Sequence, residues 1–566
     1  MRRAIEQMVK WKKWYGKGEW IMGILWYGGS IYTLQKEGHI VEAVLTENDR
    51  IIAVGDRKKL EQQYHRMIEK SCHLNGKTMI PGFVDSHIHL IGHGEKLMRL
   101  DLSSCTSKAA VLEALKAYAE TVQTGEWIIG EGWNENLWRD AKAIERNDLD
   151  EVVPDHPVLL KRICRHVLVV NSLTLEEVSI QEDVNPPQGG VIERDKEGRL
   201  NGVFKEKAQD MVLNAVPNRS KEQLKEVLKH AIKDAYTKGL TGVHTEDLSY
   251  YNGFEETYQI YKEVIEEEGL SFRAHLLVHY AVLEDFKRAA GHYLQGSPWL
   301  EFGAIKIFAD GSLGGRTALL SHPYADDPTT SGVAIFSQEQ LNQLVARARE
   351  IEMPVAIHAI GDKAFEMVVR SIEEHPLKGK GKDRIIHAQI LRRDLIDRVK
   401  KLPVVLDIQP GFLASDFPWV IDRIGENKLD YCYAWKTLLE EQIPCAGGSD
   451  APIEEISPLL GIHAAVARVS QQTNEVYQHE EALSLYEAVS LYTKGSAEAA
   501  CHETERGLIK EGYLADFTIL EQDIFRCHSD EIVNINVDST VIGGHIVYRR
   551  EENITITEQK RFSSYK

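Results

Sequence analysis

The middle of the chain alternates short apolar runs with amphipathic stretches, which is the pattern of a parallel α/β structure. Eight of these runs have the length and the apolar composition of buried strands. They lie at residues 82–87, 242–246, 272–278, 304–308, 355–358, 384–387, 403–407 and 444–450. Most neighbours are separated by about the 30 residues that a βαβ unit requires. We therefore predict a TIM-type (β/α)8 barrel, in which the active site lies at the carboxyl ends of the strands.

The two ends of the chain have a different pattern, in which short β-branched runs are separated by glycine, asparagine and aspartate. The runs are residues 24–33, 41–45 and 51–55 near the N-terminus and 512–520 and 540–548 near the C-terminus. Neither end is long enough to bury a convincing core alone. We therefore expect both ends to pair in one small composite β-sandwich. The predicted bounds are 22–80 with 505–550 for this domain, and 81–104 with 239–504 for the barrel.

One interval breaks the alternation. Between His89 and Gly242 lie about 150 residues, several times what one crossover needs. We interpret residues 105–238 as an inserted α/β domain, which contains the aromatic stretch 127–138. Residues 1–21 are basic and aromatic and lack the apolar centre of a secretory signal, so we expect them to form an exposed N-terminal arm.

Composition narrows the range of partners. A net charge of -19 argues against a nucleic-acid partner, because binding to phosphates needs a basic patch. Seven scattered cysteines without a C-x-x-C motif suit reduced thiols better than disulfides or a cysteine zinc site. No apolar run approaches the ~18 residues of a membrane-spanning helix. We expect a cytoplasmic protein that acts on a small molecule, away from membranes, with a homodimer as the default assembly.

Two histidines at the end of the first predicted strand have the spacing of a metal site. Side chains at positions i and i+2 of a strand share a face, so His87 and His89 can point at one ion. Zinc binds imidazole nitrogen at about 2.0–2.1 Å. The alternative is two unrelated histidines at a strand end. The preceding segment, residues 81–85, is largely apolar and gives no reason of its own for two imidazoles, which favours the metal site.

Three further residues stand in or at the end of later strands. Lys306 lies inside an apolar strand, where desolvating an ammonium group is costly. We interpret it as a lysine bound to metal through a modification that replaces its positive charge with a carboxylate; the alternative is a lysine at the barrel rim. His358 and His387 each end a short apolar run. Either alone would be an ordinary core or rim histidine, but two at the same end of successive strands predict a ligand pair.

Asp450 stands in the segment 446–452, whose glycines let the backbone approach the site closely. A metal-bound water needs a base that accepts its proton, and a carboxylate within hydrogen-bond reach can serve. We therefore predict that Asp450 is both a metal ligand and the catalytic base. The alternative is an aspartate that caps the next helix.

The order His-x-His, Lys306, His358, His387 and Asp450 across the predicted strands resembles the amidohydrolase superfamily. The flanking motifs are similar to its amidohydrolase 3, or YtcJ-like, branch, which includes N-substituted formamide deformylase. The resemblance runs from about Ile24 to Tyr548, essentially the whole chain. Its motifs are residues 81–89, 130–134, 306–317, 358–362 and 448–452.

This resemblance implies a distorted barrel with a composite β-sandwich and one or two divalent metal ions, usually zinc. His87 and His89 would then bind the more buried metal. Lys306 would be the carboxylated bridge between the metals, and His358 and His387 would bind the second one. Asp450 would hold and deprotonate the attacking water.

The predicted reaction is hydrolysis of a non-peptide carbon–nitrogen bond in an amide, an N-substituted formamide or a cyclic amide. Metal-activated hydroxide would attack the carbonyl carbon, and Asp450 would pass a proton to the leaving nitrogen. Two alternatives stay open: a deaminase of a cyclic amidine or heterocycle, and a metal-binding scaffold without turnover. The deaminases commonly lack the bridging lysine and carry a glutamate in strand five. The motif 358–362 has no glutamate, which favours amide hydrolysis.

Weaker candidates for contacts with the substrate are Trp133, Asn134, His166, Asp310 and Arg316. The guanidinium fork of Arg316 could hold a carbonyl or anionic group, or it could form a salt bridge that shapes its loop. Asp310 could orient Lys306 or the same loop. Trp133 and Asn134 could cover the pocket, although aromatic residues at that spacing are more often core. His166 follows Cys-Arg where relatives often carry Asp-Gly, which weakens the transfer of a substrate-binding role to it.

Overall fold

The computed structural model describes residues 23–550, except 134, 136–137, 139–142, 163–166, 188–189 and 217, together with 556–558. The arm predicted at residues 1–21 lies outside this part of the chain. The chain divides into two compact units, Met1–Gly94 with Lys221–Lys566 and Glu95–Ser220. The first unit contains the barrel and the paired chain ends, and the second is an insertion after the first barrel strand.

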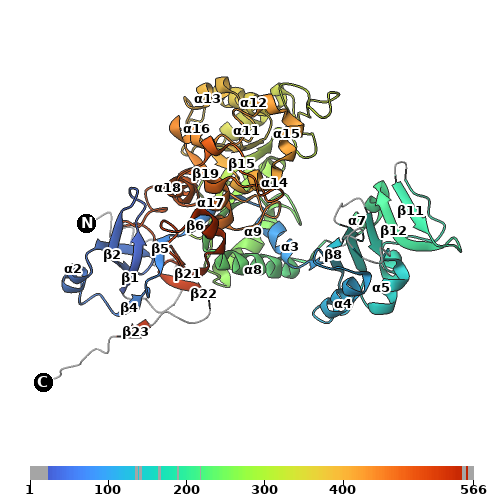
Figure 1. Ribbon diagram of the computed structural model, residues 1–566, viewed down its shortest axis with the longest axis horizontal. Coiled ribbons are helices and arrows are strands. Elements are labelled where there is room, and N and C mark those ends of the chain that lie inside the picture. Colours follow the sequence, from blue (N-terminus) through green and yellow to red (C-terminus); the bar gives the residue numbers. More distant parts are fainter. Residues whose placement is uncertain are drawn as a thin grey trace. The chain divides into compact units, whose positions relative to one another are not determined.

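Eight parallel strands form the barrel sheet within the described residues, and they coincide with the eight runs that the sequence predicts (Figure 1). Nearly all their residues are buried, which is why they read as apolar runs rather than as alternating patterns. The last strand approaches the first through two backbone hydrogen bonds of 2.8 Å, from Asp450 N–H to His87 O and from His89 N–H to Ala451 O. The strands are β6 (Phe83–Ile88), β13 (Leu240–Thr245), β14 (Arg273–His279), β15 (Leu300–Phe308), β16 (Val355–Ala359), β17 (Asp383–His387), β18 (Val404–Ile408) and β19 (Cys445–Gly447).

Helices lie between consecutive barrel strands along the chain, and each buries one apolar stripe. On α12 the buried apolar stripe consists of Ala364, Phe365, Val368, Val369 and Ile372, which recur every three to four residues. The start of α11 is fixed by a capping box, in which the Ser337 and Gln340 side chains each accept the other residue's backbone N–H. The helices include α8 (Lys221–Thr237), α9 (Phe254–Lys262), α10 (Leu283–Arg288), α11 (Gln338–Arg349), α12 (Asp362–Glu374), α13 (Arg393–Val399) and α16 (Trp435–Glu440).

Both chain ends join one sheet, which has nine strands in the described part of the chain. The two ends meet where β5 pairs antiparallel with β20, with Pro81 opposite Phe517. Trp26 of β1 lies edge-on to Phe517, with ring centroids 5.8 Å apart, in an apolar core shared by both ends. The strands are β1 (Ile24–Tyr32), β2 (Ile40–Glu47), β3 (Arg50–Gly55), β4 (Lys70–His73), β5 (Thr78–Pro81), β20 (Phe517–Leu520), β21 (Val537–Ile542), β22 (His545–Arg549) and β23 (Ile556–Glu558).

The unit Glu95–Ser220 is an α/β fold with its own apolar cores. Its bounds differ from the predicted 105–238, because helix α8 packs against β13 and α9 of the barrel unit. A β/α barrel needs a helix before its second strand, and α8 is that helix. The sheet order is β11 (Gly190–Arg194), β12 (Leu200–Glu206), β10 (Val167–Val170), β9 (Val158–Arg162), β8 (Ile128–Trp133) and β7 (Leu100–Asp101), with α4 (Lys108–Ala119), α5 (Arg146–Val152) and α6 (Ser172–Glu177) between strands.

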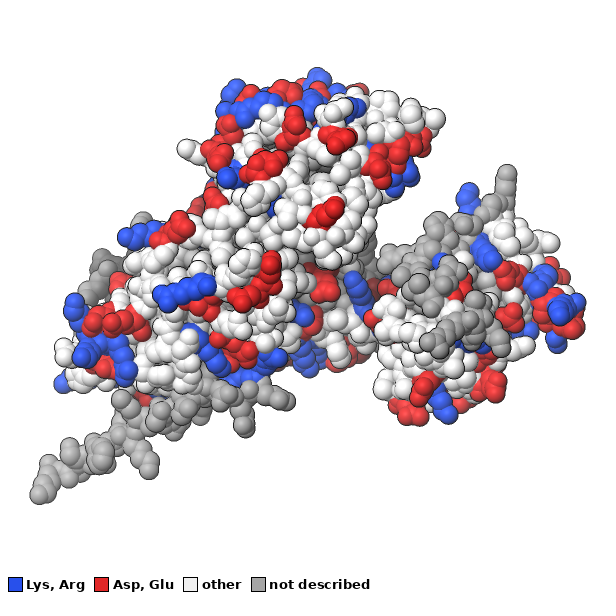
Figure 2. Space-filling model, viewed as in Figure 1, with Lys and Arg blue, Asp and Glu red and all other residues white. Residues whose placement is uncertain are grey.

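The surface carries mixed charge. On the face that Figure 2 shows, the described lysine and arginine side chains are interspersed with aspartate and glutamate. None of the described helices combines the length and the apolar character that crossing a membrane requires.

Candidate metal centre

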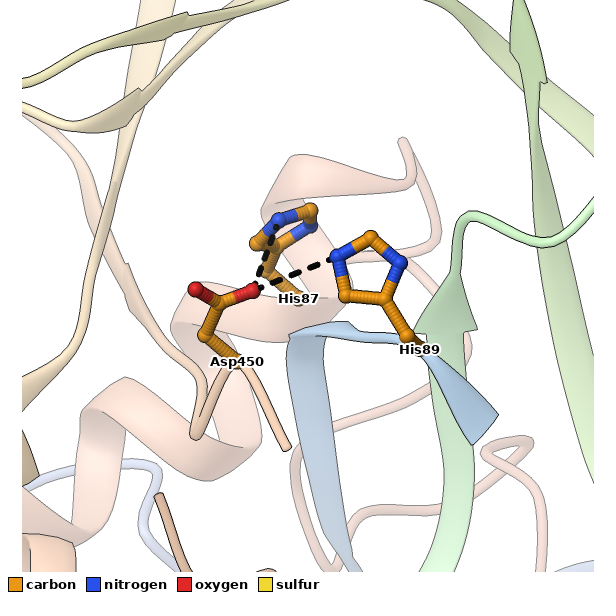
Figure 3. A group of neighbouring side chains, drawn as sticks. All are labelled: His87, His89 and Asp450. Atoms are coloured by element: carbon orange, nitrogen blue, oxygen red, sulfur yellow. Dashed lines mark ion pairs between the residues drawn. The ribbon is translucent and has the colours of Figure 1, made fainter. Parts of the chain in front are cut away.

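His87, His89 and Asp450 meet at the carboxyl end of the barrel, where Figure 3 shows their side chains pointing toward one another. His87 lies in β6, His89 stands one residue beyond it, and Asp450 follows β19. Asp450 Oδ1 lies 3.4 Å from His87 Nε2 and 3.4 Å from His89 Nε2. The i, i+2 spacing of the two histidines therefore places both imidazoles on one side of the strand end, opposite the carboxylate.

These distances fit a metal ion. Two ligand atoms about 2.1 Å from one tetrahedral zinc lie about 3.4 Å from each other. The separations between the carboxylate oxygen and the two imidazole nitrogens have this value. Nitrogen and carboxylate oxygen are also the donors that zinc and similar divalent ions accept. The three ligand atoms lie within 4.8 Å of one another, so the three residues could hold one ion.

The imidazole of His89 is oriented by the next barrel strand. Its Nδ1 lies 2.9 Å from the carbonyl oxygen of Glu246, which can only accept a hydrogen bond. Nδ1 must therefore carry the proton when the ring is neutral, which leaves the Nε2 lone pair facing Asp450. Metal-binding histidines are usually fixed in this way.

Asp450 is positioned by a close contact between β6 and the segment after β19. The Asp85 carboxylate accepts hydrogen bonds from the backbone N–H groups of His87, at 3.0 Å, and Ser449, at 3.0 Å. A Cβ atom on Gly448 would lie 2.7 Å from His87 N, so only glycine fits there. Asp450 itself has φ +58°, a left-handed conformation that is uncommon for residues other than glycine. The glycines thus allow the approach that the sequence predicts.

His358 and His387 form a second pair beside the first. Their ring centroids are 4.4 Å apart, and the His387 ring is 5.7 Å from that of His87. His387 Nδ1 lies 2.7 Å from Gln409 Oε1, which leaves its Nε2 available. His387 also has φ +76°, so its backbone is strained at the strand end. His358 Nε2 lies 3.1 Å from the carbonyl oxygen of Gly311.

Lys306 is fully buried in β15, and its Nζ has no hydrogen-bond partner among the described residues. The ammonium lies 4.2 Å from the centroid of the Phe308 ring. Burial lowers the pKa of Lys306 to about 8, although the carboxylates of Glu246 and Asp450 act in the opposite direction. A buried amine without a partner is unfavourable, which is an observation in favour of a modified or metal-bound lysine.

The loop after β15 uses Asp310 and Arg316 for its own structure. Asp310 accepts hydrogen bonds from the backbone N–H groups of Ile360, at 3.1 Å, and Gly361, at 2.9 Å. It orients the loop and lies 3.4 Å from His358 Nε2. Arg316 forms a two-pronged ion pair with Asp326, at 3.1 and 2.9 Å. This pair is the loop-shaping contact that the sequence offered as the alternative, and a contact between Arg316 and the substrate stays a prediction.

Of the three candidates in the inserted unit, the structure describes Trp133. Trp133 is 3% exposed and packs against Trp138, with ring centroids 6.1 Å apart, in an apolar core of that unit. This packing gives Trp133 a structural role in that core, and its contact with a substrate stays a prediction. Asn134 and His166 lie outside the described residues.

Two acidic residues at the end of β13 were not predicted. Glu246 is fully buried, and its carboxylate oxygen Oε2 lies 3.5 Å from His89 Nδ1. Burial raises its pKa to about 7. Asp247 is also fully buried and accepts hydrogen bonds from Thr245 and Tyr261. Glu246 ends a predicted strand, as the histidines do. This position at a strand end was the sequence feature that could have identified Glu246 as a candidate site residue.

A cavity of about 370 Å³ lies over the histidines and Asp450. His87, His89, His358, His387 and Asp450 all line it. Its other walls come from the segments after β15, β18 and β19 and are apolar, except for a few polar groups. The metal centre therefore stands at the floor of a chamber large enough for a small organic substrate.

The sequence profile of the amidohydrolase family matches residues 72–548 of this chain. YtcJ of Bacillus subtilis, an amidohydrolase by name, is 48% identical over 531 residues, which cover 94% of this chain and 100% of YtcJ. N-substituted formamide deformylase of Arthrobacter pascens is 26% identical over 537 residues, with 92% of this chain and 97% of the deformylase covered. A solved structure of an uncharacterized metal-dependent hydrolase from Pyrococcus furiosus is 29% identical, with a TM-score of 0.76 over 89% of this chain and 100% of that chain.

Proposed function

The chain belongs to the amidohydrolase family and is a metal-dependent hydrolase, and from this premise we propose that it cleaves a non-peptide carbon–nitrogen bond. The bond would belong to an amide, an N-substituted formamide or a cyclic amide. One observation carries the proposal: a carboxylate oxygen stands 3.4 Å from two imidazole nitrogens at the floor of a substrate-sized cavity. The similarity to N-substituted formamide deformylase supports the formamide in particular.

The metal would be held by His87, His89 and Asp450, with His358 and His387 as ligands of a second ion. Zinc is the ion that this set of nitrogen and oxygen donors fits well. When bound, a divalent ion acidifies water and polarises a carbonyl oxygen. All five side chains face the same cavity, so a substrate carbonyl can reach them.

Asp450 would move the proton. Burial alone would raise its pKa, but the hydrogen bond from His89 holds the pKa below its usual value. The carboxylate is therefore ionised at neutral pH and can accept the proton of the attacking water. It then delivers that proton to the leaving nitrogen. Water adds hydroxyl to the carbonyl carbon and hydrogen to nitrogen, so that the products are a carboxylic acid, or formate, and an amine.

Lys306 would carry a carboxylate as a carbamate. The neutral amine adds carbon dioxide and releases one proton, and the new group is an anion where the free lysine would be a cation. The lowered pKa of Lys306, about 8, makes a neutral amine accessible at physiological pH. Incorporation of ¹³C-labelled bicarbonate, detected as a carbamate carbon resonance that is lost in Lys306→Ala, tests this assignment.

The experiment is a screen of N-substituted formamides, N-acyl amines, lactams and cyclic amidines with zinc-reconstituted protein. Release of formate, acid or amine is measured for the first three classes and release of ammonia for the fourth. Cleavage of a formamide or amide supports the proposal. Ammonia release from amidines alone would assign the chain to the deaminases instead.

A further inference from the structure

The unit that contains the barrel has another cavity, at the end of the barrel opposite the metal centre. It lies by the amino ends of β13 and β14, and its volume is about 30 Å³. A cavity needs about 10–15 Å³ to hold one water molecule, so this one has room for one or two groups of that size. Its wall includes residues of β6, β13 and β14, of the segment 493–508 and of the segment that precedes β20. The cavity therefore lies where the barrel meets the paired chain ends.

Three carboxylates act on the charged groups of this cavity, and each has a cationic partner of its own. Asp516 pairs with Arg273 at 2.6 Å, Glu301 with His502 at 2.6 Å and Glu505 with Arg50 at 3.1 Å. Burial opposes the charge on His502, but hydrogen bonds to the two glutamates raise its pKa, which favours the charged imidazole. The charges of these pairs therefore cancel.

Arg506 is the cation that these pairs leave over. Its Nε is buried and has no hydrogen-bond partner among the described residues. Its Nη2 lies 3.4 Å from the carbonyl oxygen of Pro298, which is long for a hydrogen bond. Burial lowers the pKa of Arg506, although Glu301 and the other nearby carboxylates act in the opposite direction. Since a guanidinium group stays charged in proteins, the wall of the cavity has one positive charge without a direct counter-ion in the described part of the chain.

A neutral histidine lines the same cavity. His244 is 4% exposed, and its Nδ1 is buried without a hydrogen-bond partner in the described structure. Burial and the positive charge of Arg384 lower the pKa of His244 well below the usual 6.5, so the ring is neutral. A neutral imidazole has one N–H donor and one acceptor nitrogen. The cavity thus offers N–H donors from Arg506 and from His244, which are far apart in sequence.

We propose that this cavity binds one small monovalent anion, of the size of chloride, with the Arg506 guanidinium as its counter-charge and His244 as a second donor. Hydrogen bonds from a charged guanidinium group are stronger than those between neutral groups. The cavity is too small for a nucleotide or an amide substrate, and Arg506 and Arg273 in its wall disfavour a metal cation. The bound ion joins the barrel to the segment after α19 (Ser496–Ala499) and stabilises the folded chain, independently of the reaction at the metal centre.

Thermal unfolding in two salts tests the proposal. Sodium chloride replaces sodium gluconate stepwise at constant ionic strength, because gluconate is too large for the cavity. A ligand that binds only the folded state raises the melting temperature, and for a chain of this length we expect about 2 °C when chloride is about a hundredfold above its Kd. Equal melting temperatures in the two salts would overturn the proposal.

The variant Arg506→Gln assigns the effect to this cavity. It removes the charge, so the rise with chloride should disappear, and the loss of stability relative to wild type should be smaller in gluconate than in chloride. If Arg506 served only as a distant partner of the carboxylates, the loss would be equal in both salts, which would contradict the proposal. The control is Arg526→Gln, at an exposed arginine after β20, which should keep the wild-type rise.

Bromide locates the ion directly, and this measurement uses the wild-type protein, so it decides the question even where Arg506→Gln does not fold. Crystals grown in sodium bromide should show an anomalous-scattering peak in this cavity, next to Arg506. Bromide peaks at the metal centre or on the surface alone would refute the site.

Discussion

His89 and Asp450 form a charged pair, with His89 Nε2 3.4 Å from Asp450 Oδ1. Burial opposes the charge on His89, but the carboxylates of Asp450 and Glu246 raise its pKa to about 9. His87 differs, because burial and the nearby Lys306 lower its pKa well below the usual 6.5. One imidazole is therefore neutral and ready to bind a metal, whereas the other holds a proton at neutral pH.

This difference predicts that metal binding depends on pH. A metal needs the deprotonated imidazole, so below pH 9 the ion must displace the His89 proton. We expect the apparent zinc affinity to rise by up to about tenfold per pH unit between pH 6.5 and 8.5, with release of about one proton per ion at pH 7. Competition with a chelator at several pH values, and calorimetry in buffers of different ionisation enthalpy, measure both quantities. A pH-independent affinity would show that His89 is not the protonated group.

Replacement of Asp450 separates chemistry from folding. Asp450→Asn keeps the shape of the side chain but removes the proton acceptor, so we expect kcat/KM to fall by about 10² to 10⁴. Bound metal should also decrease, whereas the melting temperature should stay within a few degrees of wild type. The control is Asp422→Asn, which alters an exposed aspartate. Wild-type turnover in Asp450→Asn would exclude this residue as the base.

At the level of elements, the contact between β6 and the segment after β19 fixes the position of Asp450, the predicted base. Gly448 lets the segment after β19 pass against the backbone of His87, and Asp85 holds both segments through their N–H groups. His87 lies in the first barrel strand and Asp450 follows the last one, and the two residues are more than 350 positions apart in sequence. Closure of the barrel and assembly of the site are therefore the same structural event.

Gly448→Ala tests this junction. The added methyl group would lie 2.7 Å from His87 N and 2.9 Å from Asp85 Oδ1, both in rigid, buried positions. We expect the free energy of unfolding to fall by about 1–3 kcal/mol and the bound metal to decrease, because the strands must separate. The matched control is Gly92→Ala in α3 (Leu90–Leu97), where the nearest atoms are an ordinary 3.5 Å away. Urea unfolding should show the control to be neutral or slightly stabilised.

At the level of the whole molecule, a chain of ionisable groups joins the barrel to the paired chain ends. Glu301 of β15 lies 2.9 Å from His275 Nδ1 and 2.6 Å from His502 Nε2. His502 Nδ1 lies 3.1 Å from Glu505, which pairs with Arg50 of β3. Together they connect the barrel to the β-domain through charged hydrogen bonds.

His502 is the link whose removal should be most costly. Despite burial, Glu301 and Glu505 raise its pKa, and His502 in turn lowers the pKa of Glu505 to about 2. The ionised glutamates stabilise the fold above pH 4.5, and this stabilisation is lost as the pH falls toward 2. The protonated His502 stabilises the fold below pH 6.5, and its stabilisation is lost as the pH rises past the pKa that His502 has in the folded protein. The stabilisation is therefore greatest between about pH 4.5 and 6.5.

We expect His502→Ala to lower the free energy of unfolding by about 3 kcal/mol in that window, because Glu301 would remain buried with one partner fewer. The loss should shrink toward pH 8. His292→Ala, at an exposed histidine, should change little at any pH. Urea unfolding at pH 5.5 and 8 measures the difference, and equal losses at both values would contradict the charged role of His502.

The sequence by itself determined the elements and the residues of the candidate centre. Buried parallel strands are apolar along their whole length, so polar residues such as His87, His358 and His387 stand out where the strands end. The i, i+2 spacing of His87 and His89 also defined a shared face, because the strand period is two. These are local signals, and all eight barrel strands were readable from them.

Only the tertiary structure decided what depends on contacts between distant segments. Folding paired the guanidinium group of Arg316 with Asp326 and placed Trp133 in an apolar core. It also packed α8 against the barrel and brought Glu246 beside His89. The sequence pattern around a charged loop residue is the same whether the residue forms an ion pair, packs against other side chains or faces a ligand. Its role is fixed by burial and by the partner that folding brings to it.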